Sequence, residues 1–421
     1  MNILAYALHL GIAGHGPIGG GFVRFIEILR RAKNHGVNYV VIENKPSFKK
    51  LYHLEYEAYE IETRVSKSHH ISLLTLLIKA VNLGVKRCQQ GDIDLIVSPL
   101  DQVFNVFPAY FTSKLTGIPW TVVLQGVPVY WHLLGESTCQ KSTSKFRDIY
   151  SFFKREAQKR GTTTNPIIAS MAYWMMYKII RSTIVLSVNQ SITEDLSIID
   201  KKLKVITCEH GNAIDFQRII KVSSSNAKQY DIIFPSLSPY KGIFHVLEAL
   251  AFIVKEVPKV RIAICGIGTK YTIEKVKEKL KDKRFDTNLT FPYGIGKGPS
   301  TQEDLWSLMK KAKIMLYPTM AESWCLIIGE ALACGLPVIT YDIRPIRYIY
   351  GSCPAVIRVP VGNIKELAAK TIELLKNEEL CQNLSCVAVK FAEQNFSWDE
   401  VVKDEKKAYL TVMKALKYAY S

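Results

Sequence analysis

The sequence lacks paired cysteines. Its nine cysteines are scattered, and none forms a Cys-x-x-Cys pair or a cluster with histidine. We therefore expect neither a disulfide framework nor a metal site. Isolated cysteines of this kind are typical of small buried side chains in a reducing compartment, so a cytoplasmic protein is predicted.

The sequence also lacks an uninterrupted hydrophobic run long enough to cross a bilayer. Its most apolar stretch, "IIASMAYWMMYKIIRSTIVLSV", is broken by Lys178 and Arg181 before the roughly 20 residues that a span needs. The first residues resemble a signal peptide only superficially, because a basic start is missing and His9 interrupts the apolar run. We predict a first β-strand there and no transmembrane helix.

Acidic residues are in the minority, and the net charge is +17. Such an excess favours polyanionic partners, namely phosphates, anionic lipid surfaces or nucleic acid. Nucleic acid is not expected, because no arginine-rich arm and no aromatic RNA-binding motif is present.

Strand-length apolar runs alternate with helix-length segments along the chain, which predicts parallel sheets covered by helices on both faces. With 421 residues, two domains are expected. The polar stretch "QRIIKVSSSNAKQ" separates two such series of strands. The predicted fold is α/β, with two doubly wound Rossmann-like domains facing a cleft. The predicted ranges are 1–215 for the first domain, 216–230 for a linker, 231–396 for the second domain and 397–421 for a final helix.

A glycine-rich loop follows the first predicted strand. In "GHGPIGGG", Gly14, Gly16 and Gly19 satisfy a G-x-G-x-x-G pattern, and Glu43 ends the next predicted strand where a dinucleotide-binding acid would lie. The pattern favours backbone contact with a phosphate or sugar. A tight turn that needs flexible residues is the structural alternative.

A lysine opens the first helix of the second domain. In "SPYKGIFHV", Lys241 lies where a helix begins, and its charge would add to that of the helix dipole, which suits a diphosphate. A solvated surface lysine is the alternative.

Two glutamates flank an apolar run in "AESWCLIIGEALACGLPV". Glu322 and Glu330 would lie about 12 Å apart in one helix, whereas the paired carboxylates of a glycosidase lie about 5–9.5 Å apart. We therefore predict that Glu322 lies in a loop and that the helix begins near Cys325 or Leu326. Glu330, inside the helix, would accept hydrogen bonds from a diol. An N-terminal helix-stabilising carboxylate and an ion-pair partner are the structural alternatives.

The whole stretch "YPTMAESWCLIIGEALACGLPVITYD" resembles the E-x7-E region of retaining GT-B glycosyltransferases of family GT4 (glycosyl transferases group 1). Further motifs of that family are similar to "GGGFVRFIEILRRAKNHGVNYVVI", "VITCEHGNAIDF", "SLSPYKG" and "FSWDEVVKDEKKAYL", so that the resemblance extends over nearly the whole chain.

The resemblance implies a role for individual residues. Glu322 would contact the donor sugar, Lys241 the diphosphate and Glu330 the nucleotide ribose. Trp324, Cys325 and Leu326 would provide backbone amides for the diphosphate. Gly19 and Gly20 of the first loop would face the phosphates or the sugar of the donor. The donor would be a UDP- or GDP-sugar, and the acceptor a glycan or lipid-linked molecule. As in the family, no metal or other cofactor would be needed for transfer with retention of configuration.

Two positions depart from the family pattern. Ser236 replaces an arginine, which removes a positive charge beside the diphosphate, and Gln125 replaces a histidine on the acceptor side. His132 or Arg24 would be the candidates to compensate.

The departures keep a non-catalytic subunit open as an alternative, alongside a nucleotide-sugar epimerase of the same fold. An NAD oxidoreductase would rest on the first glycine loop alone. The segments "STSKFRDIYSFFKREAQKRG" and "SMAYWMMYKIIRS" mix aromatic and basic residues at helical spacing. They predict either a surface helix on an anionic membrane, which would place the protein at the inner face of the cell membrane, or an ordinary packed amphipathic helix.

Overall fold

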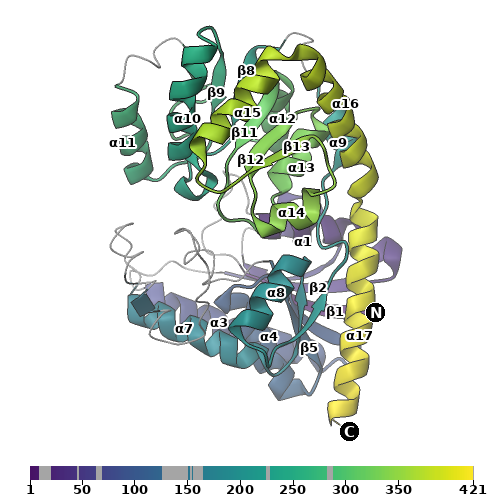
Figure 1. The fold of residues 1–421 in the computed structure, drawn as a ribbon. Coiled ribbons are helices and arrows are strands. Elements are labelled where there is room, and N and C mark those ends of the chain that lie inside the picture. The colour runs from purple at the N-terminus through teal and green to yellow at the C-terminus, as the bar shows by residue number, and fades with distance from the viewer. Residues whose placement is uncertain are drawn as a thin grey trace. The chain divides into compact units, whose positions relative to one another are not determined.

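The computed structural model divides the chain into two compact units, which are described separately (Figure 1). The residues that it describes are 1–8, 20–44, 47–62, 69–125, 150–151, 154, 165–223, 228–281 and 288–420. Unit 1 comprises the described residues up to Ala213 and the segment from Trp398 onward. Unit 2 comprises Ile214–Ser397.

Unit 1 is built on a sheet of seven parallel strands in the order β3-β2-β1-β4-β5-β6-β7. The inner strand β1 is fully buried from its second residue, as a continuous apolar run predicts. The strands are β1 (Asn2–Ala7), β2 (Asn38–Asn44), β3 (Glu57–Ile61), β4 (Leu95–Ser98), β5 (Trp120–Leu124), β6 (Ile184–Ser187) and β7 (Lys204–Thr207).

The helices of unit 1 connect these strands, and the last of them returns from the far end of the sequence. They are α1 (Gly20–Ala32), the 3-10 turn η1 (Lys33–His35), α2 (Phe48–Leu51), α3 (His69–Cys88), α4 (Val103–Thr116), α7 (Pro166–Ile180), α8 (Gln190–Ile199) and α17 (Trp398–Tyr420).

A buried ion pair fastens α17 to α1. The guanidinium of Arg24 contacts the Glu405 carboxylate and donates from Nε to the Gly211 carbonyl at 2.5 Å, and both charged side chains are almost fully buried. Tyr409 donates to the same carboxylate, which helps to satisfy it. Arg24 therefore serves the packing of unit 1, and the prediction that it compensates for a missing charge at a ligand site is wrong.

Unit 2 has six parallel strands in the order β10-β9-β8-β11-β12-β13. They are β8 (Tyr230–Phe234), β9 (Ile262–Ile264), β10 (Leu289–Thr290), β11 (Ala312–Tyr317), β12 (Val338–Tyr341) and β13 (Val356–Val359). The helical segments are α9 (Phe216–Lys221), η2 (Pro239–Lys241), α10 (Ile243–Glu256), α11 (Lys270–Lys279), α12 (Gln302–Lys310), α13 (Leu326–Ala333), α14 (Arg344–Tyr350), α15 (Ile364–Lys376) and α16 (Glu378–Asn395).

The two sheets confirm the predicted α/β class, and three details differ from the sequence prediction. The range expected as a linker contains α9, which begins after the Asp215 cap and buries Ile219 completely. The sequence pattern does not predict the edge strand β3, because EAYEI is only partly buried and carries two glutamates. The apolar run "LTFPYG" predicts a strand over 289–294, but only the first two of these residues form β10.

None of the described helices is both long and apolar enough to cross a membrane.

Candidate functional site

The strand order places a topological switch point in the middle of unit 2. The chain runs outward from β8 to β9 and β10, and then returns to the other side of β8 with β11. In open parallel sheets, ligands bind beyond the carboxyl ends of the strands at this point. The loops that follow β8 and β11 therefore define the candidate site.

These two loops are joined by backbone contacts. The amide of Met320 donates to the Tyr240 carbonyl at 2.9 Å. Gly242, at φ +89°, caps the start of α10, and a Cβ atom there would lie 2.4 Å from the Pro318 carbonyl oxygen. Only glycine fits both the left-handed backbone and this close approach. The "KG" of the sequence motif is therefore explained locally by the packing of the two loops.

An ion pair bridges the same loops. The Lys241 ammonium lies 2.5 Å from Oε1 of Glu322 and 3.2 Å from the Ala321 carbonyl oxygen, to which it donates. The hydroxyl of Thr319 donates to the same glutamate oxygen at 3.0 Å. Glu322 lies in the loop between β11 and α13, as predicted, with a side chain that is 9% exposed, whereas that of Lys241 is 28% exposed. A fixed carboxylate and a solvent-accessible ammonium thus stand together at the strand ends.

The start of α13 is fixed by an unusual backbone position. Cys325, the residue before the helix, has φ +62°, which is rare for a residue with a side chain. The buried hydroxyl of Tyr350 holds this turn, since it donates to the Cys325 carbonyl at 2.9 Å and accepts from the Gly329 amide at 3.2 Å. Helix amides before the first full turn have no intrahelical partner, so the start of α13 offers N–H donors and a partial positive charge. Trp324 and Cys325 are buried and Leu326 is half-buried.

Glu330 lies in the second turn of α13, and no described residue forms an ion pair with it. Burial raises the pKa of its carboxyl group from 4.5 to about 7, and the neighbouring Trp306 indole offsets only part of this effect. The alternative of a structural ion-pair partner therefore finds no support in the described residues. Glu322, in turn, is held by Lys241 and Thr319 rather than by the amides of α13.

Ser236 follows β8 and is half-buried. Its hydroxyl accepts from the Ser238 amide at 3.2 Å, which shapes the loop. Gly266, after β9, packs so closely on this loop that a Cβ atom would lie 2.8 Å from the Ser236 Cα atom. The backbone here is tightly packed, and the serine itself brings no charge.

The predicted residues of unit 1 are described only in part. Gly20 is exposed at the first position of α1, and Gln125 is half-buried after β5, where its amide donates to the Pro99 carbonyl at 3.2 Å. Gly19 and His132 lie outside the described residues. So do the other two glycines of the G-x-G-x-x-G pattern, Gly14 and Gly16.

Glu43 does not present a free carboxylate to a dinucleotide. Its oxygens accept from the Phe48 amide at 2.8 Å and from the Tyr56 hydroxyl at 2.9 Å, and the residue is fully buried. Burial raises the pKa of this carboxyl group to about 6. The residue therefore anchors the short helix α2, and the basis for an NAD oxidoreductase disappears at this position.

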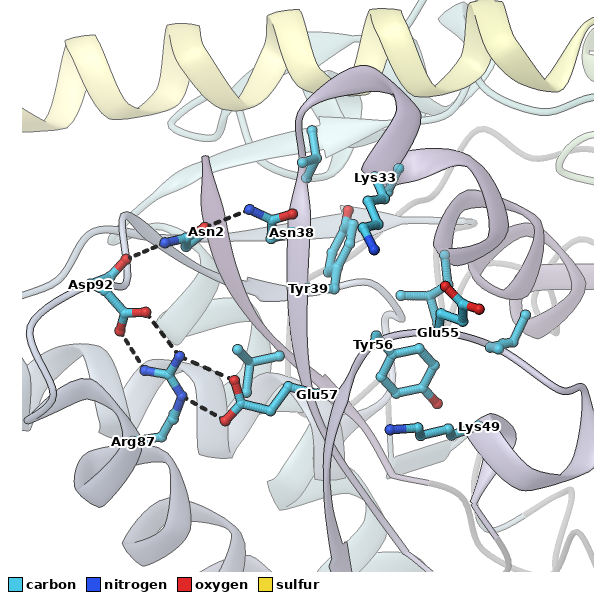
Figure 2. Close-up of a pocket in the computed structure, with 15 residues that line it drawn as sticks. Asn2, Lys33, Asn38, Tyr39, Lys49, Glu55, Tyr56, Glu57, Arg87 and Asp92 are labelled. Atoms are coloured by element: carbon cyan, nitrogen blue, oxygen red, sulfur yellow. Dashed lines mark hydrogen bonds and ion pairs between the residues drawn. The ribbon is translucent and has the colours of Figure 1, made fainter.

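A pocket of about 460 Å³ in unit 1 lies elsewhere (Figure 2). It surrounds Asn2, Asn38 and Glu57, which begin β1, β2 and β3, and so it opens at the amino ends of these strands. Arg87 in its wall is already paired, at 3.0 Å with Glu57 and 2.5 Å with Asp92 (Figure 2). The pocket lies at the edge where α/β sheets do not bind their ligands.

Sequence reasoning missed Thr319 and Tyr350, which position the site. Thr319 could have been found from its place two residues after β11, where a hydroxyl can reach the following loop. Tyr350 had no local signal, because it lies 25 residues beyond the turn that it holds. Among the described residues, no group of three or more histidine, cysteine or acidic side chains is placed to hold a metal ion.

The candidate site lies in the part of the chain that matches a known protein family. Residues 215–390 match the family model described as glycosyl transferases group 1. Poly(glycerol-phosphate) alpha-glucosyltransferase of Bacillus subtilis (strain 168) is 30% identical over 182 residues, which make up 42% of this chain and 25% of that protein. The chain thus spans only about a quarter of the length of this relative.

Solved structures resemble the chain over nearly its full length. A glycosyltransferase from Rickettsia africae ESF-5 has a TM-score of 0.67 at 16% identity, covering 98% of both chains. Anabaena Alr3699/HepE, solved in complex with UDP and glucose, has a TM-score of 0.68 at 14% identity, covering 98% of this chain and 100% of that one. The fold is therefore that of GT-B glycosyltransferases, with two Rossmann-like domains, as predicted from the sequence.

Proposed function

We propose that the protein is a retaining glycosyltransferase of family GT4, which transfers a hexosyl group from a nucleoside-diphosphate sugar to a glycan or lipid-linked acceptor. The observation that carries the proposal is the Lys241–Glu322 pair at the carboxyl ends of β8 and β11, beside the start of α13. The match of residues 215–390 to glycosyl transferases group 1 supports the same reaction class.

Lys241 is proposed to bind the diphosphate of the donor. An ammonium group has three N–H donors. Two of them are engaged by Glu322 and the Ala321 carbonyl, so one donor remains among the described contacts. Because the side chain is partly exposed, this donor can reach a phosphate oxygen without breaking the ion pair.

The amino end of α13 is proposed to share the negative charge of that diphosphate. Phosphates bind readily at helix starts, where amides and dipole act together. The amides of Trp324, Cys325 and Leu326 lie in this turn, whose shape is fixed by the positive φ of Cys325. A turn that is already formed needs no reorganisation when charge develops on the leaving group, which lowers the barrier.

The two glutamates take different parts of the donor. Glu322, held by Lys241 and Thr319, would accept hydrogen bonds from hydroxyls of the sugar. Glu330, one turn into α13 and without a cation partner among the described residues, would accept from the ribose diol. Ser236 supplies no positive charge beside the diphosphate. Lys241 and the α13 amides would therefore have to stabilise all of the diphosphate's negative charge.

In the proposed step, the bond between the anomeric carbon and the diphosphate oxygen breaks. The acceptor oxygen forms its bond to that carbon on the same face, and its proton passes to the departing phosphate oxygen. Lys241 and the α13 amides supply positive charge, so we propose that no metal is required. Full transfer in the presence of a chelator is expected, and its loss would contradict this part.

A panel of UDP-, GDP- and ADP-sugars tests the proposal, with thermal stabilisation as the first readout. A ligand that binds only the folded state at 100 times its dissociation constant adds about 2.7 kcal/mol. We expect one nucleotide sugar to stabilise the wild type but not Lys241→Ala. Glu322→Gln should remain folded and lose transfer.

Glu256→Gln is the matched control, because it breaks the exposed Lys376–Glu256 ion pair at the last residue of α10, the end of that helix opposite to Lys241. It should bind and transfer like the wild type. Stabilisation of Lys241→Ala equal to that of the wild type would refute the assigned phosphate site. Binding of a nucleotide sugar without transfer or hydrolysis would instead favour a non-catalytic subunit.

A further inference from the structure

Three neighbouring helices of unit 1 leave an unusual number of large apolar side chains in solvent. Half of the eighteen exposed large apolar residues of the described chain lie on α3, α4 and α7. Their exposed fractions run from 37% to 67%. They are Leu74, Ile78, Phe111, Leu115, Ile167, Ile168, Met171, Trp174 and Met175, and together they define the α3–α4–α7 face.

These side chains form one surface rather than scattered points. The helix α4 packs against both α3 and α7, and the three helices lie side by side in Figure 1. In α7 the exposed residues Ile167, Met171, Trp174 and Lys178 recur at the spacing of one helix face. The opposite face of α7, with Met176 and Ile180, is buried in unit 1. The solvent-exposed face of α7 is therefore largely apolar, as is the face that packs against the core.

The charge on the same helices has a single sign. From end to end, α3, α4 and α7 contain no aspartate and no glutamate. Lys79, Lys86, Lys114 and Lys178 are all exposed on them. The Lys178 ammonium lies 5.3 Å from the centre of the Trp174 ring, so a cation and an aromatic ring are presented together.

We propose that the α3–α4–α7 face docks on the surface of an anionic lipid bilayer. Apolar side chains would enter the boundary between headgroups and acyl chains, and the lysines would contact the phosphates. Charge selects this occupant, because a second copy of the face would set lysines against lysines, whereas anionic headgroups neutralise them. The helices lie on the bilayer and do not cross it.

The proposal extends the membrane interpretation of "SMAYWMMYKIIRS" and assigns it to three helices instead of one. It does not rest on the proposed glycosyl transfer, since none of its residues belongs to the site in unit 2. The two proposals can therefore fail separately.

Vesicle co-sedimentation tests the docking surface with the full chain. We expect binding to vesicles of phosphatidylcholine with 30% phosphatidylglycerol, little binding to pure phosphatidylcholine, and weakening as salt is raised. A single lysine near an anionic surface contributes about fivefold to partitioning. The double variant Met171→Glu/Trp174→Glu should lower partitioning by more than about tenfold.

A matched control is Phe252→Glu, which places the same charge at a 45% exposed apolar side chain of α10 in unit 2. It should bind vesicles like the wild type. Lipids with brominated acyl chains should quench part of the tryptophan fluorescence, and that part should be absent from Trp174→Phe.

Three results would overturn the proposal. One is no binding to anionic vesicles, and another is equal binding by the double variant and the wild type. The third is a dimer in solution that the double variant dissociates, because the occupant would then be a second copy. Thermal stabilisation by the nucleotide sugar reports separately on the site in unit 2, so a loss of vesicle binding with that response intact concerns the α3–α4–α7 face alone.

Discussion

Replacement of Glu330 by glutamine should make unit 2 more stable than the wild type at pH 8, and it should weaken nucleotide binding. The Glu330 carboxyl is held among buried residues of α13 and α12 with no cation partner in the described chain. Its ionised form is needed to accept hydrogen bonds from a diol, but burial disfavours that form. The ionised Glu330 carboxylate that would bind the diol is therefore expected to lower the stability of the folded protein.

The size of the effect follows from the pKa. Burial raises the pKa of Glu330 from 4.5 to about 7, which disfavours the ionised form by at most about 3 kcal/mol. Between these two values the folded state binds more protons than the unfolded state, so stability falls as the pH rises through this window. The side chain is only half-buried, and solvent screening lowers the expected penalty at pH 8 to about 1–2 kcal/mol.

The assay compares the melting temperatures of the wild type and Glu330→Gln at pH 5 and pH 8. Glutamine does not titrate, so the variant should gain stability relative to the wild type as the pH rises. For a domain of this size, 1 kcal/mol corresponds to about 2–4 °C. In the same samples, affinity for the nucleotide sugar should fall by about 10- to 100-fold, because a hydrogen bond to a charged group contributes about 1.5–3 kcal/mol.

Glu256→Gln serves as the control, since Glu256 is exposed at the end of α10 and paired with Lys376. It should change little between the two pH values. If Glu330→Gln is equally destabilised at pH 5 and pH 8, the carboxylate is held by compensating contacts and the reasoning fails. If nucleotide affinity is unchanged, the ribose assignment fails while the stability argument stands.

Two further predictions concern packing around the site and within unit 1. Tyr350→Phe removes the hydroxyl that links the Cys325 carbonyl and the Gly329 amide, and urea unfolding should show a loss of about 1–3 kcal/mol with weaker donor binding. Unchanged stability would show that water replaces the hydroxyl. Arg24→Met strands the Glu405 carboxylate and should cost about 3–5 kcal/mol, whereas the double variant Arg24→Met/Glu405→Met should regain much of this loss. A double variant as unstable as the single one would contradict the ion-pair explanation.

The sequence predicts most elements of both sheets, because the central strands are buried on both faces and read as continuous apolar runs. The edge strands β3 and β10 escape this pattern, since they are short or partly exposed. The start of α13 near Leu326 could be predicted from the position of two glutamates that do not pair. An apolar run in the sequence is sufficient to predict a strand that is buried on both faces. It is not sufficient for a strand that is short or only partly buried.

Contacts between distant residues could not be predicted. Lys241 and Glu322 are 81 positions apart, and their ion pair emerges only when β8 and β11 become neighbours. Arg24 carries a charge that suggests a surface or a ligand, but its partner is 381 positions away and both are buried. The sequence therefore supports the chemistry of single residues better than the pairing among them.

The position of α17 has a consequence for the order of folding. Unit 2 is inserted between the parts of unit 1, so it can complete its core while α17 has not yet been synthesised. Unit 1 cannot, because the Arg24 guanidinium stays without its carboxylate until Glu405 has left the ribosome. The half of the protein that is translated first is thus finished last. During synthesis its α1 surface stays open, and this interval is when unit 1 would benefit most from a chaperone.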